Sequence, residues 1–262
     1  MRYDAGPPRR RIRPRDGRIG IPRSLAYDEL RVFFDHLLGA HGFELVRSPP
    51  TTAITLERGS KLCVDEVCFP LKTFYGHVAA LADAGVDTVL VPRLVSVAQG
   101  RNLCPKFAVL PDLVEAAFDG LHVLAPYVDL HHARRPDLAR HLRDACRTML
   151  RELGAWSRAS NAAVVEAFAA ELAARRRHPS LGSKRCKDAA AGQPLRVAVV
   201  GHRYAERDPF LGVGVIAELR RLGALVVTSP ASCPEHPVPL EEGIYYEPSV
   251  RAARAIEAHL DD

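Results

Sequence analysis

The sequence predicts an α/β protein with mostly parallel sheets, organised in two parts. Short apolar runs of strand length alternate with segments of helical periodicity between residues 18 and 132, and the alternation resumes at residue 195. A strand, a helix and a further strand form a unit whose crossover makes the two strands parallel. The length of 262 residues is enough for two modest domains with a real core.

The first part, residues 18–132, is expected to form one α/β lobe. Strands are predicted at residues 18–21, 43–46, 86–91 and 121–125, and helices at residues 27–38, 70–84 and 110–118. The helix at 70–84 has the clearest pattern, because Leu71, Phe74 and Val78 fall on one stripe. That stripe predicts a helix face packed on the core, with Cys68 and Lys72 on a different side of the same axis.

The second part is predicted to be small. Residues 133–193 are expected to form a connection of two helices, broken near Gly154, and a linker. In the second lobe, residues 194–262, we predict strands at 195–200 and 224–228 and helices at 213–222 and 249–260. Two strands and two helices bury too little apolar surface to be stable alone. This lobe must therefore pack on the first lobe, pair with another chain, or be an incomplete version of a longer fold.

The positive charge of the sequence lies at its N-terminus. The net charge is +5, and the first 18 residues hold seven arginines against two aspartates, which accounts for all of it. The remaining chain is neutral, so its charge gives no reason to expect a nucleic-acid surface. Residues 1–17 are predicted to be a disordered basic tail, with contact to an acidic partner as the alternative.

The sequence also indicates a cytoplasmic protein. No secretory signal is recognised, because no long apolar segment follows the arginines. No run approaches the roughly 20 apolar residues that span a bilayer, so no membrane partner is expected. Six cysteines in 262 residues are too few for a secreted disulfide scaffold.

Cys68 is the residue that points most directly to chemistry. It stands just ahead of a predicted helix start, and Pro70 suits the first turn of a helix because its missing N–H would be unpaired there anyway. The positive end of the helix dipole favours a thiolate, the form that soft metals and iron–sulfur clusters bind. Thirty-six residues later, Cys104, Pro105 and Lys106 repeat the pattern.

Three polar residues near Cys68 each have two interpretations. Lys72 either tunes a cluster or binds an anion, or it is a solvated side chain. Glu66 is either an acid/base group or a residue that favours a helix N-terminus. His77 either donates a hydrogen bond near a cofactor or is a satisfied core histidine. All three are candidate catalytic residues.

A second group of candidates lies in the second lobe. His202, Tyr204 and Asp208 follow a strand, at the end where open α/β sheets bind ligands. No G-x-x-x-x-G-K-S/T segment is present, so the chain is not itself a P-loop ATPase. Gly212-Val213-Gly214 does not directly follow a strand and is no dinucleotide fingerprint.

Several short segments follow one another in the order and spacing of a known family. The most specific is Cys68-Phe69-Pro70-Leu71-Lys72 followed by Gly76-His77, and the others are at residues 19–23, 48–52, 92–93, 104–106, 111–112, 201–204 and 208–209. Over residues 18 to 260 the chain resembles the activase-related proteins of 2-hydroxyacyl-CoA dehydratase systems. Their unit occurs alone or behind the ATPase modules of long CoA-enzyme activases.

The resemblance implies two Rossmann-like lobes that hold a cysteine-ligated iron–sulfur cluster, of the 4Fe-4S type, between them. It implies low-potential electron transfer or a reductive step. It also maps Cys68 and Cys104 onto family cysteines that bind the cluster. The implied cofactor-binding residues are Pro22, Arg23, Gly201, His202, Tyr204 and Asp208.

The third cluster ligand stays open. Cys63 precedes Cys68 by five residues, the C-x4-C step of plant-type ferredoxins, and Cys233 is the other candidate. Similar proteins continue past the segment at 244–246 into a Gly-Cys-Gly loop, whereas this sequence ends at Asp262. Residues 201–205 read Gly-His-Arg-Tyr-Ala where the family has Gly-His-Pro-Tyr-Asn. Zinc bound by cysteines with His77 or His202 is an alternative.

Two functions therefore remain as hypotheses. The first is an iron–sulfur redox protein whose partner is an ATP-dependent reductase/activase component or a dehydratase-like subunit. The second is a non-catalytic or truncated α/β subunit that needs a partner chain to complete its site. Pairing of two copies as a dimer is a further option for the second lobe.

Overall fold

A computed structural model describes residues 11–25, 30–97, 99–100, 102–132, 138–177, 194–202, 204–205 and 208–228. The chain divides into two compact units, Met1–Glu171 and Leu172–Asp262. The predicted helix at 249–260 and linker at 179–194 lie essentially outside the described residues. None of the described helices is long and apolar enough to cross a bilayer.

The centre of the first unit is a parallel sheet. Its strands are β1 (Arg18–Ile21), β2 (Glu44–Arg47), β3 (Thr88–Leu90) and β5 (His122–Leu124), in the order β2-β1-β3-β5. Neighbouring strands all run parallel, with Ile19 opposite Leu45 and Val89 opposite Val123. The predicted α/β fold with parallel sheets is confirmed. The chain passes from β1 outward to β2 and then back across β1 to β3, so the direction of winding reverses between β1 and β3.

Two of these strands continue as a second, smaller ladder. β4 (Arg93–Ser96) and β6 (Tyr127–Asp129) pair in parallel. They follow β3 and β5 directly, after Pro92 and Pro126. Proline has no N–H for the ladder, which breaks each long strand into two. The backbone N–H of Val91 still donates to the carbonyl of Leu124 at 2.9 Å, so the two ladders are linked.

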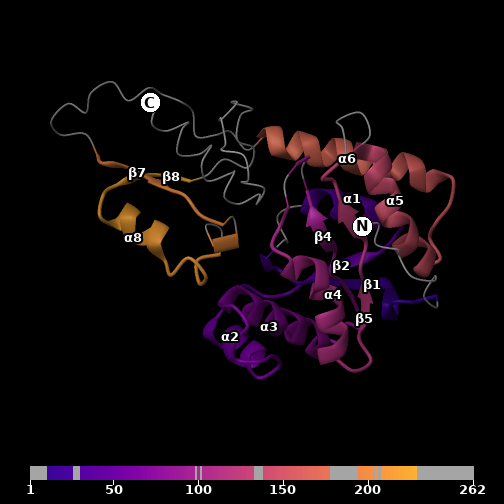
Figure 1. Ribbon diagram of the computed structural model, residues 1–262, viewed down its shortest axis with the longest axis horizontal. Coiled ribbons are helices and arrows are strands. Elements are labelled where there is room, and N and C mark those ends of the chain that lie inside the picture. The colour runs from indigo at the N-terminus through magenta and orange to yellow at the C-terminus, as the bar shows by residue number, and fades with distance from the viewer. Residues whose placement is uncertain are drawn as a thin grey trace. The chain divides into compact units, whose positions relative to one another are not determined.

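Helices cover both faces of this sheet (Figure 1). They are α1 (Arg31–Ala40), α2 (Ala53–Ser60), α3 (Phe69–Asp83), α4 (Lys106–Ala117), α5 (Leu138–Glu152) and α6 (Ala159–Arg177). α2 and α3 lie together on one side, and α1 gathers with α5 and α6 on the other. Phe33 and Leu37 of α1 share one buried cluster with Leu142 and Met149 of α5 and with Val164 of α6. The helices expected to form a connection thus pack into the core of the first unit.

The structure differs from the sequence-based expectation at several elements. α2, β4 and β6 were not expected. The predicted helix at 110–118 begins four residues earlier, at Lys106, and contains Pro111 in its interior. We expected residues 11–17 to belong to a disordered tail, but Ile12 is buried and its N–H donates to the carbonyl of Glu152 at 2.8 Å. Residues 1–10 of that predicted tail lie outside the described residues.

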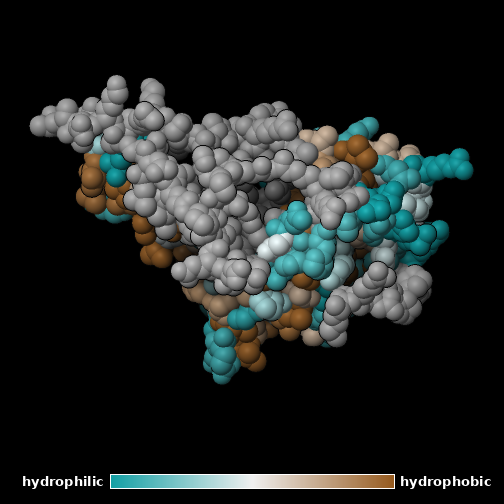
Figure 2. All heavy atoms as spheres, turned by 45° about the horizontal axis from the view of Figure 1, so that its top comes forward, coloured by the Kyte–Doolittle hydropathy of each residue, from teal (hydrophilic) through white to brown (hydrophobic). Residues whose placement is uncertain are grey.

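The described part of the second unit is small. β7 (Arg196–Val199) pairs in parallel with β8 (Leu225–Thr228), and α8 (Val215–Arg221) connects them. This matches the strand–helix–strand order expected from the sequence. Leu195, Val213, Leu222 and Leu225 are exposed, and hydrophobic atoms of this unit reach the surface (Figure 2). A two-stranded sheet with its apolar side chains in water is marginal by itself.

Candidate functional site

Cys68 occupies the N-cap position of α3. Its side chain is exposed, its thiol is free, and its carbonyl accepts two N–H groups of the first turn, from Leu71 at 2.9 Å and Lys72 at 3.1 Å. Proline lies in the first turn, as the sequence predicted. Cys68 therefore presents its sulfur to the outside at a helix start.

Exposed apolar side chains occur close to Cys68 in the sequence and on the neighbouring helix α2. Val64 and Phe69 are both exposed, and so is Ile54 on α2. Figure 2 shows hydrophobic atoms next to hydrophilic ones at the α2–α3 end of the molecule. Glu66, the candidate acid/base group, is exposed in the same loop.

Cys63 lies in a different environment, against α3. Its Sγ donates to the carbonyl oxygen of Gly59 at 3.2 Å. Burial raises the pKa of the Cys63 thiol, while the positive charge of Lys72 opposes that shift and Asp65 adds to it. Lys72 itself lies 3.9 Å from the carboxylate of the exposed Asp65. The structure thus brings the candidates Cys63 and Lys72 into one electrostatic neighbourhood.

Tyr75 completes this neighbourhood on the inner side. Its ring is buried and stacks on Phe118, with ring centroids 6.3 Å apart. Burial raises the pKa of the Tyr75 hydroxyl, and the Cys63 thiolate adds to the shift. Tyr75 and Lys72 therefore both lie close to Cys63.

Two glycines hold Cys63 close to α3. A Cβ atom at Gly59 of α2 would overlap the carbonyl oxygen of Lys72 on α3, and one at Gly76 of α3 would overlap the carbonyl oxygen of Thr55 on α2. The two helices therefore cross with their backbones in contact, as only residues without a side chain allow. The crossing places the end of α2, and Cys63 just after it, beside the first turns of α3.

Cys104 stands before the second helix start. It is a free, half-buried thiol, and its carbonyl accepts the N–H of Phe107 at 2.9 Å in the first turn of α4. Lys106 is exposed. No hydrogen bond, ion pair or disulfide between Cys104 and Cys68 is present in the described structure.

The Arg93–Asp112 pair positions α4 on the sheet. Arg93 of β4 has a side chain only 7% exposed and forms two parallel bonds to Asp112 of α4, Nη2 to Oδ1 at 2.6 Å and Nη1 to Oδ2 at 2.7 Å. Its Nη1 also donates to the carbonyl oxygen of Ala108. Such a bidentate pair fixes geometry as well as adding energy. Two of the family-like segments, at 92–93 and 111–112, therefore act on each other.

His77 is buried at the carboxyl ends of β1 and β2. It is 1% exposed, and its Nδ1 and Nε2 each lie 2.9 Å from a hydroxyl, that of Ser48 and that of Thr51. The Ser48 hydroxyl also accepts the backbone N–H of Arg23 at 2.8 Å. This arrangement matches the core-histidine interpretation given above, and its catalytic role stays a prediction.

The same network positions two implied cofactor-binding residues. Pro22 is buried directly after β1, and the side chain of Arg23 is exposed. The bond to Ser48 involves only the backbone N–H of Arg23. It fixes the backbone at this residue and does not hold the guanidinium group. The segments at 19–23, 48–52 and 76–78 thus meet at one end of the sheet.

The described residues alone do not fit a metal cluster. Among them, no group of three or more His, Cys, Asp or Glu side chains gathers in a way that would hold a metal ion. A 4Fe-4S cluster is bound by four ligands. Cys233, one candidate for the third ligand, lies outside the described residues.

The candidates of the second unit lie after β7. The rings of His202 and Tyr204 stack, with centroids 5.0 Å apart and planes 9° from parallel. Oδ1 of Asp208 accepts the backbone N–H of Phe210 at 2.9 Å and of Leu211 at 3.2 Å, which shapes the loop before α8. Gly201 is exposed at the strand end. The rings of His202 and Tyr204 thus form one stacked pair, and the Asp208 carboxylate stabilises the loop before α8.

A family described as the CoA enzyme activase uncharacterised domain (DUF2229) matches residues 18–231. The chain belongs to this family. The match begins at β1 and extends past β8, so it includes every described element of both units except the segment before β1. No curated protein and no solved structure matches the chain. The resemblance to activase-related proteins is confirmed by this match.

Sequence reasoning missed the residues that hold the site in place. Ser48, Thr51, Arg93 and Asp112 were noted only as parts of short segments, and their contacts with each other or with His77 were not foreseen. Polar residues directly after strands or within a buried strand are the signal that would have found them, since such groups need partners. Which partner each takes depends on the packing of α3 and α4.

Proposed function

We propose that this activase-family protein is an iron–sulfur component of an acyl-CoA dehydratase or reductase system, in which Cys68 and Cys104 are cluster ligands. The family description links such domains to CoA enzyme activases. The observation that carries the proposal is the pair of free thiols at the starts of α3 and α4, of which Cys68 is exposed. A helix start is an electropositive place that stabilises thiolates and anionic clusters.

The remaining ligands come from outside the two helix starts. Cys63 is turned toward the carbonyl of Gly59, so it has to give up this bond to reach a metal. Cys233 of the same chain is the alternative. Lys72 and the backbone N–H groups of α3 set the charge around the site, and charge and hydrogen bonding are what tune a cluster potential.

Anaerobic reconstitution of the full chain tests this proposal. Iron, zinc and acid-labile sulfide per chain are measured with a visible spectrum for the wild type, Cys68→Ala, Cys104→Ala and Cys146→Ala. Cys146 is a matched control, because it is completely buried and burial raises the pKa of its thiol. We expect iron, sulfide and a broad charge-transfer band in the wild type and in Cys146→Ala, with loss in the other two.

Two further variants assign the third ligand. Cys63→Ala and Cys233→Ala are reconstituted in parallel, and the variant that loses iron identifies it. Colourless, iron-free wild-type protein overturns the cluster proposal, and stoichiometric zinc without sulfide replaces it with a zinc site.

A second candidate function is a non-catalytic subunit whose site a partner chain completes. The lack of a third gathered ligand among the described residues favours it. Reconstitution of the chain together with a dehydratase-like subunit distinguishes the two. Iron that binds only in the presence of the partner supports the second candidate, and iron bound by the chain alone contradicts it.

A further inference from the structure

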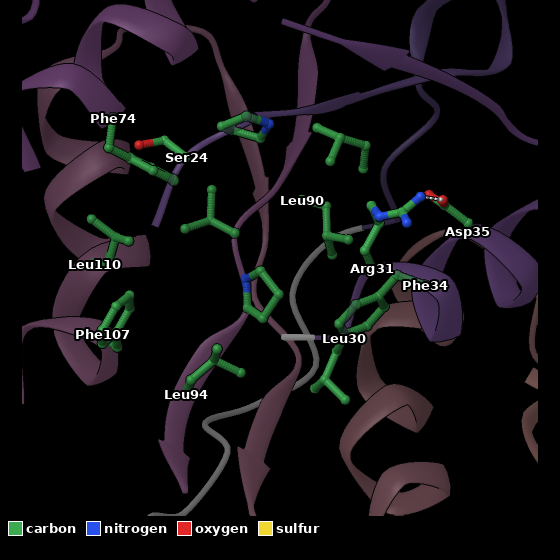
Figure 3. Close-up of a pocket in the computed structure, with 14 residues that line it drawn as sticks. Ser24, Leu30, Arg31, Phe34, Asp35, Phe74, Leu90, Leu94, Phe107 and Leu110 are labelled. Atoms are coloured by element: carbon green, nitrogen blue, oxygen red, sulfur yellow. Dashed lines mark ion pairs between the residues drawn. The ribbon is translucent and has the colours of Figure 1, made fainter. Parts of the chain in front are cut away.

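A small cavity lies inside the first unit, where β1 and β3 end. It has a volume of about 50 Å³. Figure 3 shows Phe74, Phe107 and Leu110 of α3 and α4 at one side and Leu30 and Phe34 at the other, with the strands between them. The wall is mostly apolar. Neither of the cysteines proposed as cluster ligands lines it, and of the implied cofactor-binding residues only Pro22 does.

The strand topology explains why the core is open here. β1 pairs with β3 on one side and β2 on the other, and it ends at Ile21, before Pro22 turns the chain away. β3 continues past Pro92 as β4, whose strand partner among the described residues is β6 alone. The edge of β4 on the β1 side therefore has no strand beside it. In open α/β sheets this reversal of winding is the place where a crevice forms and ligands bind.

One buried polar group faces this apolar surrounding without a partner. Ser24 lines the cavity, is 5% exposed, and its hydroxyl makes no hydrogen bond within the described structure. Leaving a buried hydroxyl unpaired costs roughly 1–3 kcal/mol. Native cores pair nearly all such groups, so this one calls for an explanation.

Charge at the cavity is already compensated. Arg31 and Asp35 also line it, and Figure 3 shows their ion pair, with 3.7 Å between Nη1 and Oδ2. Asp35 is held more closely by Arg47, at 2.8 Å. A charged molecule that enters the apolar interior loses its hydration, which is costly without a dedicated partner. The lining therefore favours an uncharged ligand.

The size of the cavity limits the ligand further. One water needs about 10–15 Å³ of such volume and two to four polar partners. The measured volume corresponds to roughly four heavy atoms. The wall is mostly apolar, and its charged residues Arg31 and Asp35 are already paired, so it offers too few partners for several waters.

From these observations we propose that the cavity at the β1/β3 switch binds a small uncharged aliphatic molecule with one oxygen, a short alcohol or ketone. Its hydrocarbon part contacts Phe74, Leu94 and Leu110, and its oxygen exchanges a hydrogen bond with the Ser24 hydroxyl. This site is separate from the metal proposal, and its test uses the iron-free protein.

Ligand-observed saturation-transfer NMR on the full chain tests the proposal with 1-propanol and acetone as probes. We expect saturable binding to the wild type. Ser24→Ala should weaken it about three- to tenfold, because one hydrogen bond of ordinary strength is lost. The exposed Ser157 serves as control, and Ser157→Ala should bind as the wild type does. Propionate, a charged molecule of similar size, should bind at least tenfold more weakly.

A thermal measurement without ligand adds a second arm. Ser24→Ala should melt at the same temperature as the wild type or higher, since the unpaired hydroxyl is removed. A variant that binds the probe more weakly but melts no lower than the wild type has lost a ligand contact, whereas a misfolded variant would melt lower. No saturable signal for either probe overturns the proposal, as does equal binding by Ser24→Ala or by propionate.

Discussion

At the scale of single residues, His77 connects three segments of the chain. Ser48 and Thr51 follow β2, Arg23 follows β1, and His77 lies within α3. Buried polar groups stabilise a fold when each of their hydrogen-bonding atoms is paired, and both ring nitrogens of His77 are. The histidine therefore fixes where the loops after β1 and β2 lie.

Replacing His77 by alanine should lower the free energy of unfolding by about 2–4 kcal/mol, because two hydrogen bonds are lost and a cavity opens. Urea unfolding followed by tryptophan fluorescence measures this, since Trp156 is the single tryptophan and lies in the first unit. His36 is exposed on α1, and His36→Ala should stay within about 0.5 kcal/mol of the wild type. A similar loss in both variants would contradict the structural role of His77.

Cys63 gives a pH dependence with a definite sign. Burial raises the pKa of its thiol in the folded protein, so the neutral thiol is favoured there. The contribution of Cys63 to the free energy of unfolding is fully present below the pKa of the thiol in the unfolded chain, about 8.5. It is lost as the pH rises through the higher pKa of the folded state. Thiolate chemistry at Cys63 should therefore begin at higher pH than for an unfolded cysteine.

The pH at which iodoacetamide alkylates Cys63, read by peptide mass spectrometry, tests this. Its midpoint should lie above that of the urea-unfolded chain. In Lys72→Gln the midpoint should move higher still, because the nearby positive charge that stabilises the thiolate is removed. Lys106→Gln, at an exposed site, is the control. A midpoint that stays the same or falls in Lys72→Gln would contradict a stabilising effect of the Lys72 charge on the Cys63 thiolate.

At the scale of elements, the crossing of α2 and α3 depends on two glycines. Gly59→Ala and Gly76→Ala each place a methyl group into a backbone carbonyl of the other helix. We expect each substitution to lower the free energy of unfolding by at least about 2 kcal/mol, because the two helices must move apart. Gly39 in α1 has open space around it, and Gly39→Ala should stabilise by up to about 1 kcal/mol.

The same unfolding experiment measures all three glycine variants. We expect Gly39→Ala to raise the free energy of unfolding and Gly59→Ala to lower it. The three glycines share the same helix propensity and differ only in the space around them. Destabilisation of Gly39→Ala as large as that of Gly59→Ala would contradict the backbone contact between α2 and α3.

The sequence predicted those helices and strands in which the pattern of apolar side chains is not interrupted. The stripe of Leu71, Phe74 and Val78 predicted α3, and the apolar runs predicted the four parallel strands. β4 and β6 were missed because prolines separate them from the runs before. α2 was missed because only Ile54 and Leu56 are large and apolar in it; its signal was Thr52, whose side chain forms a capping box with Thr55.

At the scale of the whole molecule, the order of short segments predicted the family, and the family match confirms it over residues 18–231. What the segments do locally was not predictable. Several of them hold the scaffold: Arg93 binds Asp112, and Ser48 with Thr51 holds His77. Such contacts join residues far apart in the chain, and they depend on how helices pack. Among the described residues, no side-chain hydrogen bond or ion pair of Cys68 or Cys104 is found, and their role as cluster ligands stays a prediction.

Iron K-edge X-ray absorption on the anaerobically reconstituted full chain tests the central claim most directly. We predict a first shell of sulfur around iron with an iron–iron feature, both lost when Cys68→Ala and Cys104→Ala are combined. A shell of oxygen or nitrogen that is the same in the wild type and the double variant would show adventitious iron and contradict a cluster on these two cysteines.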